Sequence, residues 1–79
     1  MTITVLLFAS FADALGHSEL ELALPAGSTV GEMVTHVQAA GGGRLPPKPL
    51  VAVNQEYAPY DHVLAAGDEV ALIPPVAGG

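Results

Sequence analysis

The chain has 79 residues, 51% of them apolar, a formal net charge of −6 and no cysteine. This length allows one small domain with a thin core, and the lack of cysteine excludes disulfides, thiolate metal sites and a cysteine nucleophile. The negative charge argues against binding to nucleic acid or to an anionic membrane surface. It favours a protein partner with a basic face, unless it serves solubility alone.

The first predicted element is a strand over residues 2–8, with the sequence TITVLLF. Apolar side chains occupy both faces of this strand, which predicts a position in the middle of a sheet or under a partner. The apolar run is too short for a membrane-spanning helix. Arg44 is the first basic residue, so the positive start of a signal peptide is also missing. We therefore expect a soluble, cytoplasmic protein.

A second strand is predicted over residues 18–25, where leucines alternate with acidic residues. The leucines would face the core. Glu19 and Glu21 would face solvent rather than act as a catalytic pair of carboxylates. Between the two strands, ASFADALG favours a short helical turn that stops at Gly16. The short connection predicts that the two strands pair in antiparallel fashion.

The main helix is predicted near residues 29–40. Thr29 and Glu32 have the spacing of a capping box, and an apolar stripe with helical spacing follows. The stripe consists of Val30, Met33, Val34 and Val37. Three consecutive glycines end this helix, and the following RLPPKP predicts an exposed loop because prolines exclude helix and central strand.

Two further strands are predicted, LVAVNQEY at residues 50–57, which breaks at Asn54-Gln55, and EVALIPP at residues 69–75. The segment between them is irregular. The order strand, strand, helix, strand, strand, with a right-handed crossover, predicts a single α+β domain over residues 1–79. Its fold would be a ubiquitin-like β-grasp, a mixed sheet with the helix across one face. The first and last strands would lie side by side at its centre.

The chain ends on PPVAGG, which predicts an extended tail over residues 74–79, outside the sheet. Prolines lack the N–H that strand pairing needs, and glycines let another protein approach the terminal carbonyl closely. The tail could reach roughly 20 Å. Because this chain has no group that could activate its own carboxylate, an outside enzyme would form an acyl-adenylate, from which a sulfur donor could displace AMP. The alternative is a frayed terminus.

The last third of the chain resembles the MoaD/ThiS family of sulfur carriers. That family reads V-x-V-N, then D-x-x-L-x-x-G-D-E-V, then P-P-V-x-G-G. The matching residues are Val51, Val53, Asn54, Asp61, Leu64, Gly67, Asp68, Glu69, Val70, Pro74, Pro75, Val76, Gly78 and Gly79. In length and element order the resemblance extends over the whole chain, and it is greatest to the small subunit of molybdopterin synthase.

The resemblance implies that an E1-like enzyme adenylates Gly79 with ATP and that a sulfurtransferase system makes the thiocarboxylate. The chain itself would bind no cofactor. Its tail would then insert into the large catalytic subunit, in a heterotetramer, and donate sulfur for molybdopterin. The residues expected to thread are Pro74, Pro75, Val76, Ala77 and Gly78. Many relatives carry an Arg-Glu pair where this chain has Ala12-Asp13, so a polar contact to a partner is missing or lies elsewhere.

Leu6, Phe8 and Phe11 are predicted to form a partner interface, because one helix can cover only one face of the sheet. The alternative is that the RLPPKP loop folds over them. The three histidines lack metal-ligand spacing, so no metal site is expected. Asp68 and Glu69 are predicted mainly to form a turn. They are also candidates for a contact with a basic groove of the activating enzyme.

Two other functions stay open. One is a sulfur carrier for thiamin or another thiolated product, although thiazole carriers tend to be shorter and to lack the Pro-Pro-Val step. The other is a ubiquitin-like interaction module without sulfur chemistry. A tag that is joined into chains needs lysines, and Lys48 is the chain's only one.

Overall fold

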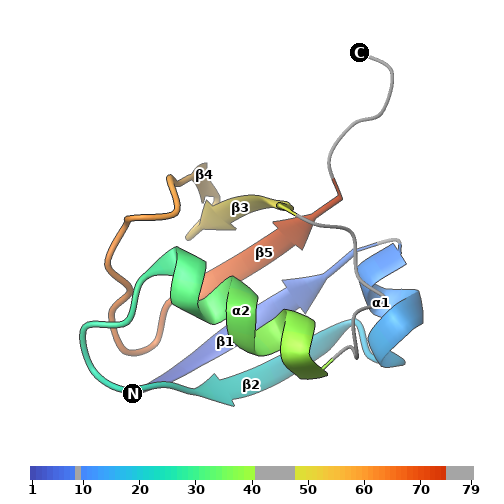
Figure 1. Cartoon of the computed structure of the whole chain (residues 1–79), viewed down its shortest axis with the longest axis horizontal. Helices are drawn as coiled ribbons and strands as arrows, with labels where there is room; N and C mark the ends of the chain where they lie inside the picture. Colours follow the sequence, from blue (N-terminus) through green and yellow to red (C-terminus); the bar gives the residue numbers. More distant parts are fainter. Residues whose placement is uncertain (9, 41–47, 75–79) are drawn as a thin grey trace.

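The computed structural model describes residues 1–8, 10–40 and 48–74 (Figure 1). In chain order the elements are β1 (Thr2–Leu7), α1 (Ser10–Leu15), β2 (Glu19–Ala23), α2 (Val30–Ala40), β3 (Leu50–Val53), β4 (Glu56–Tyr57) and β5 (Glu69–Ile73). The strands of this described part form one sheet in the order β2-β1-β5-β3-β4. β1 and β5 pair in parallel, and the other pairs are antiparallel. The predicted β-grasp, with the first and last strands adjacent, is confirmed.

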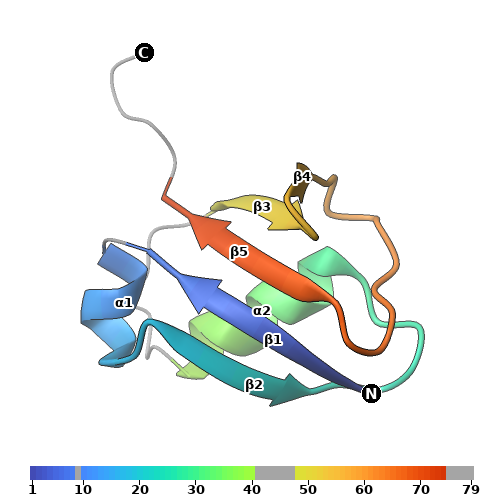
Figure 2. The ribbon, with the colours of Figure 1, turned by 180° about the vertical axis from the view of Figure 1, so that it is seen from behind.

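α2 lies across one face of the sheet, which Figure 2 shows from the opposite, uncovered side. The predicted apolar stripe of α2 is buried along its whole length, and it meets the side chains of the sheet that alternate toward it. The strand residues in this core are Ile3, Val5, Leu7, Val51, Val53, Val70 and Leu72. Within the described residues, no helix has the length and apolar character needed to cross a membrane.

The start of α2 is held by its own cap and by the loop over residues 58–68. Glu32 N donates to Thr29 Oγ1 at 3.3 Å, and Thr29 N donates to Glu32 Oε1 at 3.0 Å, which confirms the capping box. The next two amides, of Val30 and Gly31, donate to the carbonyl oxygens of His62 and Tyr60 at 2.9 Å each. The first turn of a helix leaves such amides without partners inside the helix, so the loop is fixed against the helix.

The segment predicted as one broken strand folds back on itself. Asn54 and Gln55 have φ values of 50° and 73°, and two consecutive left-handed residues make the tight turn that joins β3 to β4. Ala52 and Val53 pair with Tyr57 and Glu56 across this turn. The sheet of the described residues therefore has a fifth strand that the sequence analysis did not separate. Glycine, the usual second residue of such a turn, is absent, which weakened the signal.

The side chain of Asn54 is held by hydrogen bonds to residues more than a dozen positions later in the chain. Its Nδ2 donates to Asp68 Oδ1 at 3.0 Å, and its Oδ1 accepts from Glu69 N at 3.0 Å. Asp68 Oδ2 also accepts from Ala65 N at 2.8 Å. The two matched motifs V-x-V-N and G-D-E-V thus meet in one hydrogen-bonded unit, and Asp68 serves the turn, as predicted.

Replacing Asn54 should therefore destabilise the domain. We expect Asn54→Ala to lower the free energy of unfolding by about 1–3 kcal/mol, because the amide of Glu69 and the carboxylate of Asp68 lose a partner. Gln55→Gly should act in the opposite direction and add up to about 1 kcal/mol, since glycine adopts the left-handed turn without strain. Urea denaturation followed by circular dichroism measures both. Equal stability of the two variants would contradict the proposed anchoring.

Tyr60 ties the 58–68 loop to the start of β3. Its hydroxyl donates to the carbonyl oxygen of Pro49 at 2.7 Å, and Pro49 is buried. Tyr60 is 38% exposed, and its partial burial raises the pKa of the phenol above the ordinary value of 10.0. Donation from the neutral phenol acts in the same direction. The tyrosine therefore favours the folded state most below its unfolded pKa.

This raised pKa predicts a loss of stability as the pH rises through the folded-state pKa of Tyr60, because ionisation is then easier in the unfolded chain. We expect Tyr60→Phe to cost about 1 kcal/mol at neutral pH and to reduce the alkaline loss of stability. Urea midpoints of both proteins, compared from neutral to alkaline pH, give the measurement. Parallel curves for the two proteins would show that Tyr60 ionises equally in both states.

Candidate functional site

β5 ends at Ile73, directly before the residues that the sequence predicts to form the C-terminal tail. Ile73 pairs with Leu50 at the start of β3, and Figure 1 shows the two strand ends side by side. Pro74 follows directly, and without an N–H it cannot continue the ladder. The predicted tail residues after it, Pro75, Val76, Ala77, Gly78 and Gly79, lie outside the described residues.

An exposed apolar surface, which we call the open-face patch, surrounds this point. It consists of Leu6, Phe8, Leu50 and Ile73. The side chains of Phe8 and Leu50 are 48% and 41% exposed, and the other two are half-buried. The neighbours of these residues, such as Leu7 and Val51, point into the core, so strand alternation places the patch on the face away from α2.

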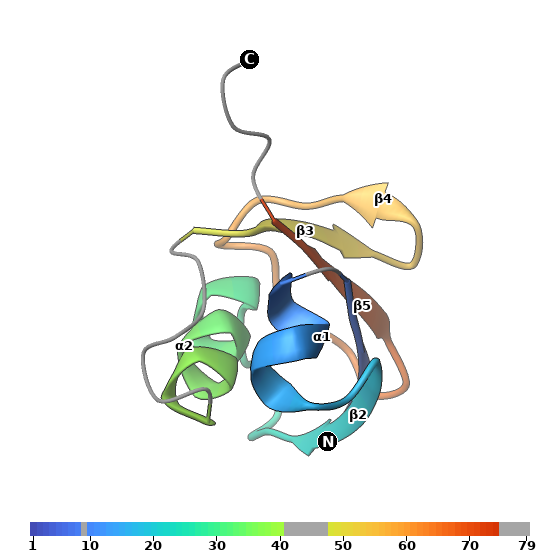
Figure 3. The same cartoon turned by 90° about the vertical axis from the view of Figure 1, so that its right-hand side faces the viewer.

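Phe11 does not belong to this patch, so the prediction that it lies at the interface surface was wrong. Its side chain is 0% exposed and is part of the core. The amide of Phe11 donates to the carbonyl oxygen of Phe8 at 3.1 Å, so the chain turns into α1 between the two rings. Figure 3 shows α1 beside α2, where Phe11 closes the end of the core. The exposure expected for Phe8 is confirmed, whereas its contact with a partner stays a prediction.

The alternative cover, the RLPPKP loop, is only partly described. Residues 44–47 lie outside the described residues. Of the remaining two, Lys48 is exposed and Pro49 is buried. Both stand directly before β3, so this loop re-enters the described structure at the same strand end as the open-face patch.

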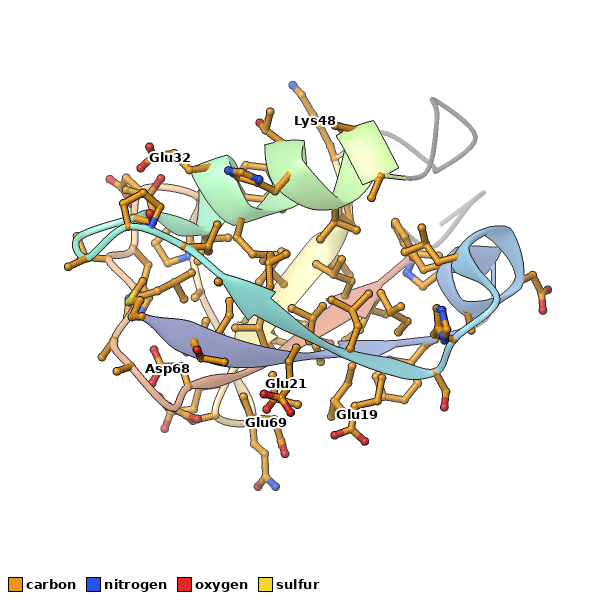
Figure 4. All side chains as sticks on the ribbon, turned by 90° about the horizontal axis from the view of Figure 1, so that it is seen from below. Glu19, Glu21, Glu32, Lys48, Asp68 and Glu69 are labelled. Carbon is orange, nitrogen blue, oxygen red and sulfur yellow. The ribbon has the colours of Figure 1, made fainter. Side chains whose placement is uncertain are left out.

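Three carboxylates also lie on the open face. Glu19, Glu21 and Glu69 are exposed, and Figure 4 shows all three on the side of the sheet away from α2, while Lys48 lies on the α2 side. Thr4 pairs with Glu21 on one neighbour strand and with Glu69 on the other, which puts these two carboxylates in one row across the sheet. The open face thus combines an apolar end near Pro74 with acidic residues, a surface suited to a partner with basic groups.

A pocket lies elsewhere in the described structure. A pocket of about 540 Å³ is lined by the β3–β4 hairpin and the 58–68 loop, with Tyr57, His62 and Asp68 among its residues. It opens beside the start of β5, at the other end of that strand from Pro74. Both oxygens of Asp68 are already hydrogen-bonded within the turn. We therefore place the candidate site at the tail and the open-face patch.

The three histidines are dispersed over the described surface. His17, His36 and His62 are all exposed. In residues 1–8, 10–40 and 48–74, no group of three or more His, Cys, Asp or Glu side chains is arranged to hold a metal ion. That no metal is needed stays a prediction.

A family model described as the ThiS family matches residues 5–79, which includes the whole tail. The chain belongs to the ThiS family. Two relatives are the molybdopterin synthase sulfur carrier subunits of Escherichia coli and Arabidopsis thaliana. The first is 39% identical over 85 residues, covering 98% of this chain and 99% of the relative. The second is 35% identical over 81 residues, covering 98% and 82%.

Solved structures of this ThiS-family fold include the small archaeal modifier protein SAMP1 of Haloferax volcanii. It is 30% identical, with a TM-score of 0.81, and the comparison covers 100% of both chains. The recognition made from the C-terminal motifs is thus confirmed at the level of the family. The interface predicted from the sequence did not include Leu50 and Ile73, which belong to the open-face patch. Their alternation with buried neighbours could have indicated them, but their pairing depends on strand register.

Proposed function

We propose that this chain is the sulfur-carrier subunit of molybdopterin synthase and that its working group is the carboxyl of Gly79. The observation that carries the proposal is the exit of the chain at Ile73-Pro74, a central strand end bordered by the exposed open-face patch. A partner that covers this patch would lie directly beside the start of the tail. The names of the two relatives that match nearly the whole chain support the same function.

The proposed chemistry uses the chain's own terminus as the carrier. A carboxylate oxygen of Gly79 attacks the α-phosphorus of ATP on an E1-like enzyme, and pyrophosphate leaves. Hydrosulfide from the sulfurtransferase system then attacks the acyl carbon, AMP leaves with the electrons of the broken C–O bond, and the thioacid gives its proton to water. The resulting thiocarboxylate donates its sulfur within the large catalytic subunit. The domain contributes position, since the fixed strand end at Ile73 sets where the acyl carbon can reach.

The open face supplies the proposed docking surface for these partners. Phe8 and Leu50 would be covered by apolar residues of the large subunit, and basic groups around them would meet Glu21 and Glu69. Charged residues at the rim of an interface act mainly on association rate and selectivity, whereas buried aromatic anchors carry most of the affinity. Because activation consumes ATP, we place the carrier in the cytoplasm.

One reconstitution tests the function. The full chain is incubated with ATP, its cognate activating enzyme and a sulfur source, and its intact mass is measured. We expect replacement of one oxygen by sulfur, and dithiolene formation after the large subunit and the pterin precursor are added. A chain that stays at its original mass, although the enzyme hydrolyses ATP with a control carrier, would refute the proposal.

A modifier function is the second candidate, favoured by the likeness to the archaeal modifier protein. In that case Gly79 would form amide bonds with lysines of other proteins. The same activating enzyme, ATP and a cell extract would then yield conjugates of higher mass that carry this chain at their lysines. The carrier proposal expects thiolation of the free chain to dominate.

A further inference from the structure

β2 is an edge of the sheet, and among the described residues it has a neighbouring strand on one side only. The amide of Leu24 donates to the carbonyl oxygen of Met1 at 2.8 Å, and the Met1 ammonium donates back to the Leu24 carbonyl at 2.6 Å. The backbone groups of successive residues alternate in direction along an antiparallel pair. Because Leu24 bonds toward β1, the N–H and C=O groups of Glu19, Glu21 and Ala23 point away from β1.

The side of this edge that faces α2 offers apolar contact. Leu20 and Leu22 pack against the core, yet both are only half-buried. Val5, which pairs with Leu20 from a strand that has neighbours on both sides, is 0% exposed. Aliphatic side chains on a strand added beside β2 would therefore cover the exposed parts of the two leucines, as cross-strand neighbours do inside a sheet.

The opposite side of the edge is acidic. Glu19 and Glu21 alternate with the leucines and are exposed, and Figure 4 shows both carboxylates on the side away from α2. Within the described part of the chain, neither carboxylate has a hydrogen bond or an ion pair, and Lys48 lies on the α2 side. Two negative charges on alternate residues of a strand are complementary to two positive charges with the same spacing on its neighbour.

The same two carboxylates argue against a second copy of this chain as the neighbour. If two β2 edges paired with each other, Glu19 and Glu21 of both copies would lie on one face, and like charges that face each other across a strand pair are destabilising. Charged side chains are a usual protection of open edges against such self-pairing. The edge therefore disfavours self-association and favours a strand of opposite charge.

We propose that the outer edge of β2 is a docking site for an extended segment of another protein, in which aliphatic residues alternate with lysine or arginine. The segment adds a strand to the sheet. Its backbone pairs with the outward-facing groups of β2, its aliphatic side chains cover the two leucines, and its basic side chains meet Glu19 and Glu21. In such complexes main-chain hydrogen bonds supply affinity and side chains supply specificity. β1 lies between this edge and β5, so the site is separate from the strand end at Ile73 and does not depend on the proposed function.

The test uses the full chain and an end-blocked peptide of alternating valine and lysine, whose pattern is the same in both directions and so suits parallel or antiparallel pairing. Amide hydrogen exchange is followed by NMR with and without the peptide. We expect the peptide to slow exchange of the N–H groups of Glu19, Glu21 and Ala23 by at least about tenfold, because they become hydrogen-bonded. The amides of β4, the other edge of the described sheet, should not change. A peptide of alternating valine and glutamate should protect neither edge.

Variants separate the backbone from the charges. Ala23→Pro removes one outward N–H, a change that edge strands tolerate, and it should lower the affinity for the lysine peptide at least about tenfold. Glu19→Lys combined with Glu21→Lys should exchange the preference. The lysine peptide should then bind about 10- to 100-fold more weakly, and the glutamate peptide should bind. Glu56→Lys, an exposed position on β4, is the matched control and should bind the lysine peptide as well as the natural chain.

Circular dichroism shows whether each variant is folded. If Ala23→Pro does not fold, the exchanged preference of the charge-reversed variant decides. Absence of protection at millimolar lysine peptide, or equal protection by both peptides, would overturn the docking site. Protection in β4 instead of β2, or an unchanged affinity of a folded Ala23→Pro, would overturn the addition of a strand. An equal loss of affinity in Glu56→Lys and in the charge-reversed variant would show attraction to the net charge of −6 alone.

Discussion

Deletion of Gly79 is expected to abolish thiocarboxylate formation while the domain folds and binds its large subunit normally. The deletion shortens the tail by one residue, ~3.5 Å. A displacement of even ~1 Å can cost on the order of 100-fold in a reaction that depends on position. The last described strand ends at Ile73, six residues before the deleted glycine, so we expect no change in stability. Intact mass after incubation with ATP, activating enzyme and sulfur source measures the loss.

An added residue after Gly79 should have the same effect, because the activated carbonyl would then belong to the wrong residue. Lys48→Arg is the matched control, since it changes an exposed side chain before β3 and leaves the C-terminus intact, and it should be thiolated as well as the natural chain. A chain without Gly79 that still gains sulfur and still supports dithiolene formation at the normal rate would disprove the carrier mechanism and favour a docking module.

The two phenylalanines near the end of β1 should respond in opposite ways. Phe8→Asp puts a charge on the exposed open-face patch, so we expect an intact fold and an affinity for the large subunit lowered by about 10- to 100-fold, as for loss of an interface anchor. Phe11→Ala empties a fully buried position and should cost about 3–5 kcal/mol of stability. That is comparable to the total for a domain of this size, so a large fraction of this variant should be unfolded.

Circular dichroism and calorimetric titration with the large subunit measure these effects. Val63→Asp serves as the control for Phe8→Asp, because Val63 is also an exposed apolar residue, at 59%, but lies in the 58–68 loop. It should bind as well as the natural chain. If Phe8→Asp unfolds, Phe8 contributes to the core and the interface assignment is wrong. If Phe8→Asp and Val63→Asp bind the large subunit equally well, the open-face patch is not the docking surface.

The sequence by itself determined the elements whose patterns are local. The alternation of Ile3, Val5 and Leu7 and the helical spacing around Met33 require neighbouring residues only, and both patterns are buried as expected. The capping box at Thr29 and the stop of α1 at Gly16, with a φ of 74°, are local as well. These patterns can be recognised in the sequence because each depends on the backbone geometry of a few consecutive residues. The terminal motif likewise indicates the family by its residues alone.

Only the tertiary structure decided the features that join distant residues. The sequence places two aromatic rings near the end of β1, but it does not tell which one enters the core. The turn into α1 settles that for Phe11. The pairing of Leu50 with Ile73 and the bond from Asn54 to Asp68 depend on strand register, which the hydrophobic pattern and turns of the whole sheet set together. Local periodicity shows which faces are apolar, whereas the surface left uncovered depends on how the elements pack.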